Sequence, residues 1–550
     1  WSTYQFIGNV ETEWTNTAKW QYFDFDSKID KTSITGVFGQ DATKVISQKG
    51  FTDNISQILQ LEGEELWAYG VKWTQGQSSA TLERIGNLNM HKTFPCHKTR
   101  GCLVLDDGTI NYYLHDSTDF LKEDGVTPSI LDGTDGDVMN YRKFYYRTAI
   151  KDGVHVNWMS PYPLPGYTLY ENLTGRYKAS INRTTGKIHS VINNSPQFRG
   201  GNNTSAWDAD GRSLLGCGVS SISRATLRSG ARINRAVEWN GSPEHDDFFA
   251  RLIYARVKWA THNFQLPFNP ALDANGYHQG GLGAGTTNLN GAKWGGYNGY
   301  NPFIPCGYTA EFGNGSGVKD FVMPFEYDGY NTTLSQQKYV GVYDSGRTYA
   351  TGEYVSDSLD TYKGSGDALL YLCILDAPAG TLLTNTTHFS LINRTVTQAI
   401  RMDGEEQWFG EIWEHYANVI IEHNADANPK TSKAYIFHKP SEITETRTGN
   451  EEFLCDLPIS EGYIREFNAG SIFPISTGGG STTYGCDYYY CNYPASGIAT
   501  RGCLGGGSAT YGSSAGPSYS GSAYSPSGSA AAVGGRLVRK SKNRVIIDKQ

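Results

Sequence analysis

The residues best suited to contact a ligand gather in one segment, 478–535, which is rich in Tyr, Ser and Gly. Tyrosine offers a rigid apolar ring with one hydroxyl group, and Ser, Gly and Asn offer adaptable hydrogen bonds, as in antibody paratopes. Sugars, which stack on aromatic faces and bond to nearby hydroxyl groups, suit the same residues. The segment therefore predicts a ligand-binding surface. The expected contact residues are Tyr484, Asp487, Tyr488, Tyr490, Asn492, Tyr493, Ser508, Thr510, Tyr511, Ser513, Ser518, Tyr519, Ser520 and Tyr524.

A stretch of Ser and Gly can instead be a disordered linker. Two features of this segment favour an ordered surface. Aromatic residues recur throughout it, and the strand-like residues 536–539 at its end could close a sheet. Glycines such as Gly505 and Gly516 are expected to be scaffold positions where the backbone needs angles that other residues avoid.

A second group of reactive side chains is Glu411, Glu414 and His415, which follow an aromatic stretch. We expect a short helix at 408–414, so that both carboxylates share one face, where paired acids can perform acid–base chemistry. Carboxylates on a solvated helix are commoner than catalytic pairs, and that is the interpretation we favour.

Asp132, Asp135 and Asp137 supply the hard oxygen atoms that Ca²⁺ prefers, but their loop lacks EF-hand spacing. A turn built from Gly and Asp is expected there. The chain also lacks an H-E-x-x-H or P-loop motif. We therefore expect no enzymatic activity, no cofactor and no bound metal.

The composition points to many short strands and loops. The chain has 550 residues, with 64 Gly, 36 Tyr and only 19% charged residues, and its length predicts several structural units. Its net charge is −8 without a long Lys/Arg block, which argues against a nucleic-acid partner. No apolar stretch is long enough for a membrane span, and nine scattered cysteines form no disulfide framework.

The elements that must position these residues divide the chain into five parts. Residues 1–23 read as the end of a small β module, and residues 24–64 read as a linker or oligomerisation segment. From residue 65 the pattern changes to alternating strands, with helices expected at 221–235 and 246–256. Residues 337–393 interrupt this pattern as an inserted β module. The earlier pattern returns in residues 394–550.

These pieces together resemble one family, the phage tail-fibre and tropism-determinant proteins that diversity-generating retroelements diversify. The resemblance covers residues 65–539 apart from the insert, and it rests on the order of nine short motifs. The motifs are Arg84–Asn87, Leu131–Met139, Lys143–Arg147, Tyr162–Gly166, Ser223–Leu227, Asn298–Gly307, Trp408–Glu414, Leu504–Ser520 and Gly534–Leu537.

The resemblance implies an α+β fold, namely a loop-rich C-type-lectin-like domain with short strands and a few helices, plus small β modules. The insert at 337–393 is similar to small carbohydrate-binding modules. The implied function is host adsorption by a tail-fibre receptor-binding protein of the virion, which binds a bacterial surface glycan or protein. The implied partners are other virion tail proteins and two further copies of the chain in a homotrimer. If a retroelement diversifies the protein, its targets are expected in segment 478–535.

Three alternatives stay open. A diversified bacterial surface adhesin would have the same binding surface, and a purely structural virion protein would bind no host cell. The third alternative follows from the lectin-like fold, which resembles that of the formylglycine-generating enzymes with their copper-binding cysteine pair. Cys486 and Cys491 have a compatible C-x4-C spacing, and thiolates favour Cu(I). The flanking pattern of that family is absent, so two buried or incidental cysteines are the favoured interpretation.

Overall fold

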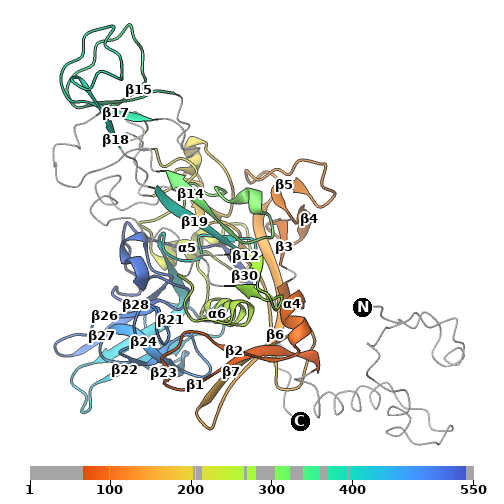
Figure 1. Ribbon diagram of the computed structural model, residues 1–550. Helices are drawn as coiled ribbons and strands as arrows, with labels where there is room; N and C mark the ends of the chain where they lie inside the picture. The colour runs from red at the N-terminus through yellow and green to blue at the C-terminus, as the bar shows by residue number, and fades with distance from the viewer. Residues whose placement is uncertain are drawn as a thin grey trace, which may run out of the picture. The chain divides into compact units, whose positions relative to one another are not determined.

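The chain divides into two compact units, Trp1–Ile58 and Leu59–Gln550. The structure is a computed structural model (Figure 1), and the residues it describes belong to the second unit. The described residues are 66–97, 99–201, 203, 205, 208, 213–265, 269–279, 304–322, 338–358, 369–392 and 396–540. The expected module end at 1–23 and linker at 24–64 lie outside them.

Among the described residues, ten strands form the larger of two main sheets. Its path is β11-β30-β8-β6-β3-β4-β5, and β7 pairs with both β6 and β1, which in turn pairs with β2. The strands are β1 (Tyr69–Thr74), β2 (Glu83–Gly86), β3 (Arg100–Val104), β4 (Ile110–His115), β5 (Thr118–Lys122), β6 (Asp137–Lys151), β7 (Val154–Ser160), β8 (Thr168–Gly175), β11 (Trp239–Asn240) and β30 (Val538–Lys540).

The second main sheet has nine described strands from the C-terminal part of the chain. Its path is β23-β22-β21-β27-β28-β26-β24-β25, with β29 paired to β21. The strands are β21 (Trp413–Asn424), β22 (Thr431–Ile436), β23 (Glu452–Asp456), β24 (Gly462–Phe467), β25 (Pro474–Thr477), β26 (Tyr488–Cys491), β27 (Ile498–Gly505), β28 (Ser520–Ser522) and β29 (Val533–Gly534).

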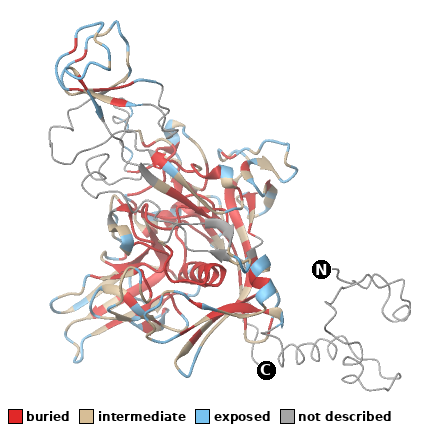
Figure 2. Ribbon diagram, viewed as in Figure 1, coloured by how far each residue is buried: buried red, intermediate tan, exposed pale blue. Residues whose placement is uncertain are grey.

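Helix α6 (His245–Trp259) lies in the core that the two main sheets share, and it contacts β1, β7 and β21. A capping box starts it, because Glu244 and Asp247 each accept a backbone N–H of the other. Ala260, in the left-handed conformation, ends it. Almost every residue of α6 is buried, as Figure 2 shows. The helix therefore acts as the hydrophobic centre of the unit.

Two cations of α6, Arg251 and Lys258, are also buried in this core beside carboxylates. Arg251 of α6 lies 3.1 Å from Glu405 and 3.2 Å from Glu414. Lys258 lies 2.6 Å from Asp403. A buried ion without a partner would be strongly destabilising. These ion pairs explain how Arg251 and Lys258 can be buried.

Smaller elements connect the two sheets. They include the short pairs β9–β10 and β12–β13, the sheet β14-β19-β20, two further α-helices and four 3₁₀ helices. Their bounds are α4 (Leu88–Thr93), α5 (Arg224–Ala231), β9 (Ser180–Ile181), β10 (Ile188–His189), β12 (Asn269–Leu272), β13 (His278–Gln279), β14 (Gly317–Val322), β19 (Val396–Met402), β20 (Glu405–Glu406), η2 (Pro95–His97), η3 (Pro196–Phe198), η6 (Ala310–Phe312) and η8 (Ala509–Ser514).

A separate four-stranded sheet lies within the range of the expected insert, 337–393. Its strands are β15 (Lys338–Val342), β16 (Glu353–Ser356), β17 (Leu370–Cys373) and β18 (Phe389–Ile392). It has a hydrophobic core of its own, in which Tyr349, Val355 and Phe389 are buried.

The predicted fold class, an α+β, loop-rich C-type-lectin-like domain, is wrong. Strands make up 39% of the structure and helices 12%, and the described residues contain only three α-helices. The expected helix at 408–414 is one source of the error, because the chain there turns and enters strand β21. The apolar residues of 408–414 pack against residues that are distant in the sequence, and these contacts outweigh the local helix propensity.

Candidate ligand-binding surface

Strand β26 decides which side chains of the Tyr-rich segment face outward. Successive side chains of a strand point to opposite faces, and along β26 Tyr489 and Cys491 are buried while Tyr488 and Tyr490 are only half-buried. The neighbouring strand β24 follows the same rule, with Tyr463 half-buried beside the buried Ile464. The two strands pair antiparallel, with Tyr463 directly opposite Tyr488.

Five tyrosines meet on this face, and we call them the tyrosine cluster. Its members are Tyr463, Tyr488, Tyr490, Tyr511 and Tyr519.

Edge-to-face contacts and hydrogen bonds hold the half-buried rings of the cluster in place. The rings of Tyr463 and Tyr488 are 5.2 Å apart at 86°. The Tyr463 hydroxyl is hydrogen-bonded with Ser513 at 3.2 Å and with Ser514 at 3.1 Å. The Tyr488 hydroxyl donates to Glu461 at 3.2 Å. Rings fixed in this way lose little conformational entropy when a ligand binds.

Tyr519 forms the inner part of the cluster. It is buried, and its ring lies 5.4 Å from that of Tyr511, which in turn lies 5.0 Å from the ring of Trp413. Gly521 lies beneath this layer, because a Cβ there would meet the Tyr519 ring at 3.4 Å and the Cβ of Tyr490 at 3.7 Å. Tyr519 therefore supports the exposed rings from below.

A buried carboxylate organises the loop that carries Tyr519. Asp487 accepts the backbone N–H of Ser518 at 2.7 Å and the Ser518 hydroxyl at 2.6 Å. Gly516 passes so close that a Cβ there would lie 1.9 Å from Asp487 Oδ1. Burial raises the pKa of Asp487 to about 7, although the bonds from Ser518 and the charge of Arg256 act in the opposite direction.

The expected contact residues fall into two groups. Five are buried and therefore act as scaffold: Asp487, Ser508, Ser518, Tyr519 and Ser520. Eight are exposed or half-buried: Tyr484, Tyr488, Tyr490, Asn492, Tyr493, Tyr511, Ser513 and Tyr524. The side chain of Thr510 lies outside the described residues.

The sequence interpretation missed several residues of this surface. Glu461, Tyr463 and Arg465 precede segment 478–535, and Trp413 lies far upstream. The alternation of Tyr463, Ile464 and Arg465 marks a strand with one outward face, which is a signal that could have identified them. The hydroxyl of Tyr493 is already engaged, since it donates to the carbonyls of residues 424 and 431.

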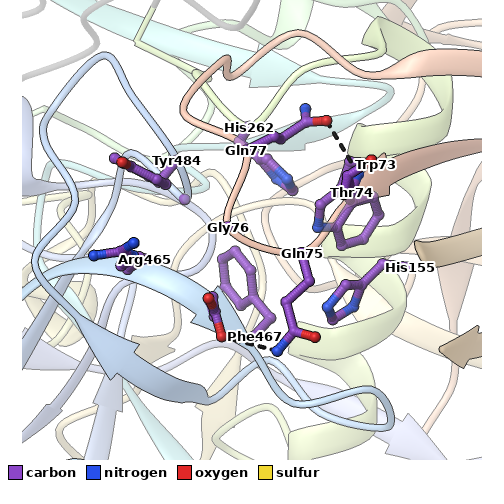
Figure 3. Close-up of a pocket in the computed structure, with 12 residues that line it drawn as sticks. Trp73, Thr74, Gln75, Gly76, Gln77, His155, His262, Arg465, Phe467 and Tyr484 are labelled. Atoms are coloured by element: carbon purple, nitrogen blue, oxygen red, sulfur yellow. Dashed lines mark hydrogen bonds between the residues drawn. The ribbon is translucent and has the colours of Figure 1, made fainter. Parts of the chain in front are cut away.

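A small pocket lies where the β1 end of the ten-stranded sheet meets β24 (Figure 3). Its space takes about one water-sized group. The pocket has an aromatic floor, in which Trp73 is stacked on His155 at 4.9 Å and meets His262 edge-on at 4.9 Å. The lining residues are Trp73, Thr74, Gln75, Gly76, Gln77, His155, His262, Arg465, Glu466, Phe467, Tyr484 and Gly485.

The turn that brings Tyr484 to this pocket has a strained backbone. Tyr484 has φ +58° and Cys486 has φ +64°, which are unusual for residues other than Gly. The turn is fixed to the hairpin that follows β1, because the Tyr484 N–H donates to the carbonyl of Ser78 at 2.9 Å. Strain of this kind costs about 1–3 kcal/mol per residue and is concentrated at functional sites.

The groups considered for enzymatic chemistry are buried. Burial raises the pKa of both Cys486 and Cys491, which disfavours the thiolate form that binds copper. Burial raises the pKa of Glu411 to about 8. Glu414 is also buried, but Arg536 and other nearby cations outweigh burial and hold its pKa well below the usual range. These carboxylates therefore belong to the core.

Two aspartates of the loop at 132–137 accept hydrogen bonds from other residues. The side chain of Asp132 accepts the N–H of Thr134, and Asp135 accepts the hydroxyl of Tyr112. Across the described part of the chain, no group of three or more His, Cys, Asp or Glu residues is arranged to hold a metal ion. Likewise, no described helix is long and apolar enough to cross a membrane.

No known protein family matches this chain, and no curated protein matches it either. The assignment of function therefore depends on the chemistry of the surface itself.

Proposed function

We propose that this chain is the receptor-binding protein of a phage tail fibre and that the tyrosine cluster contacts a bacterial surface receptor, either a glycan or a protein. The observation that supports the proposal is that segment 478–535 contains both outward-facing rings and buried residues that hold the loop. Half-buried rings of Tyr488, Tyr490 and Tyr511 face outward, while Asp487 and Ser518 fix the loop from inside. Such a surface can change its contacts while its scaffold stays constant.

The energetics of this surface suit recognition by a few aromatic contacts. Tyrosine is enriched among the residues that dominate binding energy, and removing such a residue typically costs about 2 kcal/mol or more. A homotrimer attached to other tail proteins would present three copies of the surface, so that avidity multiplies a weak single site.

Host binding by substituted chains tests the proposal. We expect the double variant Tyr488→Ala/Tyr490→Ala to bind bacterial cells at least tenfold more weakly than the parent chain, in a panel of strains probed with labelled protein. Tyr162→Ala is the matched control, because Tyr162 is 38% exposed and packs against Trp67, away from the cluster. Undiminished cell binding by the double variant would refute the role of the cluster.

The location of the native protein separates the proposal from its main alternative. A tail-fibre protein is found in purified virions, whereas a diversified bacterial adhesin is found in the cell envelope. Immunoblots of virions and of envelope fractions with an antibody against this chain distinguish the two. Detection in the envelope without virions would favour the adhesin.

A further inference from the structure

The pocket of Figure 3 continues the exposed face of the tyrosine cluster along strand β24. Tyr463 and Arg465 flank the buried Ile464, so both point away from the core. Two residues of a strand span about 7 Å. A ligand that lies on Tyr463 can therefore reach Arg465 and the pocket without leaving the strand.

Arg465 offers an uncompensated cation at the mouth of the pocket. Its side chain is exposed and forms no ion pair with a carboxylate of the described residues. Its guanidinium lies 5.3 Å from the centre of the Tyr484 ring. Stacking on an aromatic ring orients the planar guanidinium, whose donors match the two oxygens of a carboxylate.

His262 supplies a second polar group deeper in the pocket. The residue is only 4% exposed, and its Nδ1 has no hydrogen-bond partner. Burial lowers the pKa of His262 well below its usual value, and Arg256 and His155 act in the same direction. The ring is therefore neutral and keeps an unused polar atom in a lined cavity, which is costly unless a ligand or water meets it.

The acid that lines the pocket, Glu466, is hydrogen-bonded to a neighbouring amide. Glu466 accepts a hydrogen bond from Gln75 at 3.0 Å. Gln77 is also engaged, since its side chain accepts the N–H of Thr74. Arg465 and His262 are thus two lining groups with unused hydrogen-bonding capacity.

We propose that the pocket is an anchoring subsite for a carboxylate group of an acidic surface glycan. Arg465 pairs with the carboxylate at the mouth, and His262 meets a polar atom in the water-sized space behind it. The sugar rings lie on Tyr463 and Tyr488, so this inference rests on the proposed function of the tyrosine cluster. The strained turn at Tyr484 is then explained, because it brings the ring that orients Arg465.

Immobilised oligosaccharides test this assignment. The probes are oligogalacturonate, oligoglucuronate and sialyl-oligosaccharides, each paired with its methyl ester, which has the same shape without the charge. We expect the full chain to bind at least one acidic probe about tenfold more tightly than its ester. Arg465→Gln should abolish that preference, whereas Glu466→Gln should keep or increase it because it removes a repulsive charge.

Three results would overturn the inference. They are a chain that binds cells but none of the acidic probes, a preference for the esters, and unchanged binding by Arg465→Gln. Cell binding that is lost in Tyr488→Ala/Tyr490→Ala but kept in Arg465→Gln would refute the subsite alone. Cell binding that survives in both variants would refute the proposed function as well. Arg465 is exposed, so its substitution is not expected to unfold the chain, and an unchanged Tm verifies this.

Discussion

Replacing Asp487 by Asn should make the protein more stable at alkaline pH and less dependent on pH. Asp487 is fully buried, and its Oδ1 has no hydrogen-bond partner. Asn keeps an oxygen that can accept from Ser518 but carries no charge. The variant therefore removes the cost of ionising a buried carboxyl while preserving the contact that orders the loop below the tyrosine cluster.

The magnitude follows from the pKa of Asp487, which burial raises from 3.8 to about 7. Because the folded-state pKa is the higher one, the stability that the group contributes is complete below pH 3.8 and is lost as the pH rises towards 7. Between pH 5 and 8 the free energy of unfolding therefore falls by an amount that corresponds to about 2 pKa units, or about 3 kcal/mol. With an unfolding entropy of about 2.1 cal/mol/K per residue, this free-energy change corresponds to a decrease of about 3 °C in the Tm of a unit of this size.

Differential scanning calorimetry of both proteins from pH 5 to 8 measures this effect. The Tm of Asp487→Asn minus that of the parent should increase by about 3 °C over the range. Asp456→Asn is the control, since Asp456 is exposed on strand β23 and its substitution should give a constant difference. A flat or falling difference for Asp487→Asn would refute the assignment of a strained buried carboxyl.

Three further predictions concern the interior. Gly516→Ala should lower Tm by several degrees, because its Cβ would lie 1.9 Å from Asp487 Oδ1; an unchanged Tm would show that the loop can move aside. Arg251→Met should destabilise the fold by about 3–5 kcal/mol in chemical unfolding, since it leaves the buried Glu405 and Glu414 with fewer cations; a neutral effect would mean that the remaining cations suffice. All nine cysteines are buried, so a thiol reagent should label the native chain slowly and the denatured chain at nine sites, and rapid native labelling would contradict that burial.

Local patterns predicted the elements better than the architecture. The acids and apolar stripe at 246–256 gave helix α6, and the alternation around Trp73 gave strand β1. The class was wrong because strand pairing is not local. Strand β21, for example, pairs with β22, β27 and β29. The residues of β21 alone do not show which strands it will pair with.

The candidate binding surface shows the same limit. The composition of segment 478–535 predicted its tyrosines as contact residues, but it could not separate Tyr488 from the buried Tyr519. Nor could it foresee that Asp487 is buried against Gly516 and Ser518, because that contact requires the whole loop. Tyr463 and Arg465 were missed because they reach the surface only through the pairing of β24 with β26.

The position of β30 has a consequence for how the protein is made. This strand consists of the last three described residues, 538–540, and it lies between β8 and β11 of the ten-stranded sheet. Arg536, just before it, donates to the carbonyl of Gly175, 361 residues earlier. During synthesis, β8 and β11 therefore gain their shared neighbour only after residues 538–540 have been made. Contacts this distant make folding slow. A chain that stops before residue 538 would lack the strand that pairs with both β8 and β11.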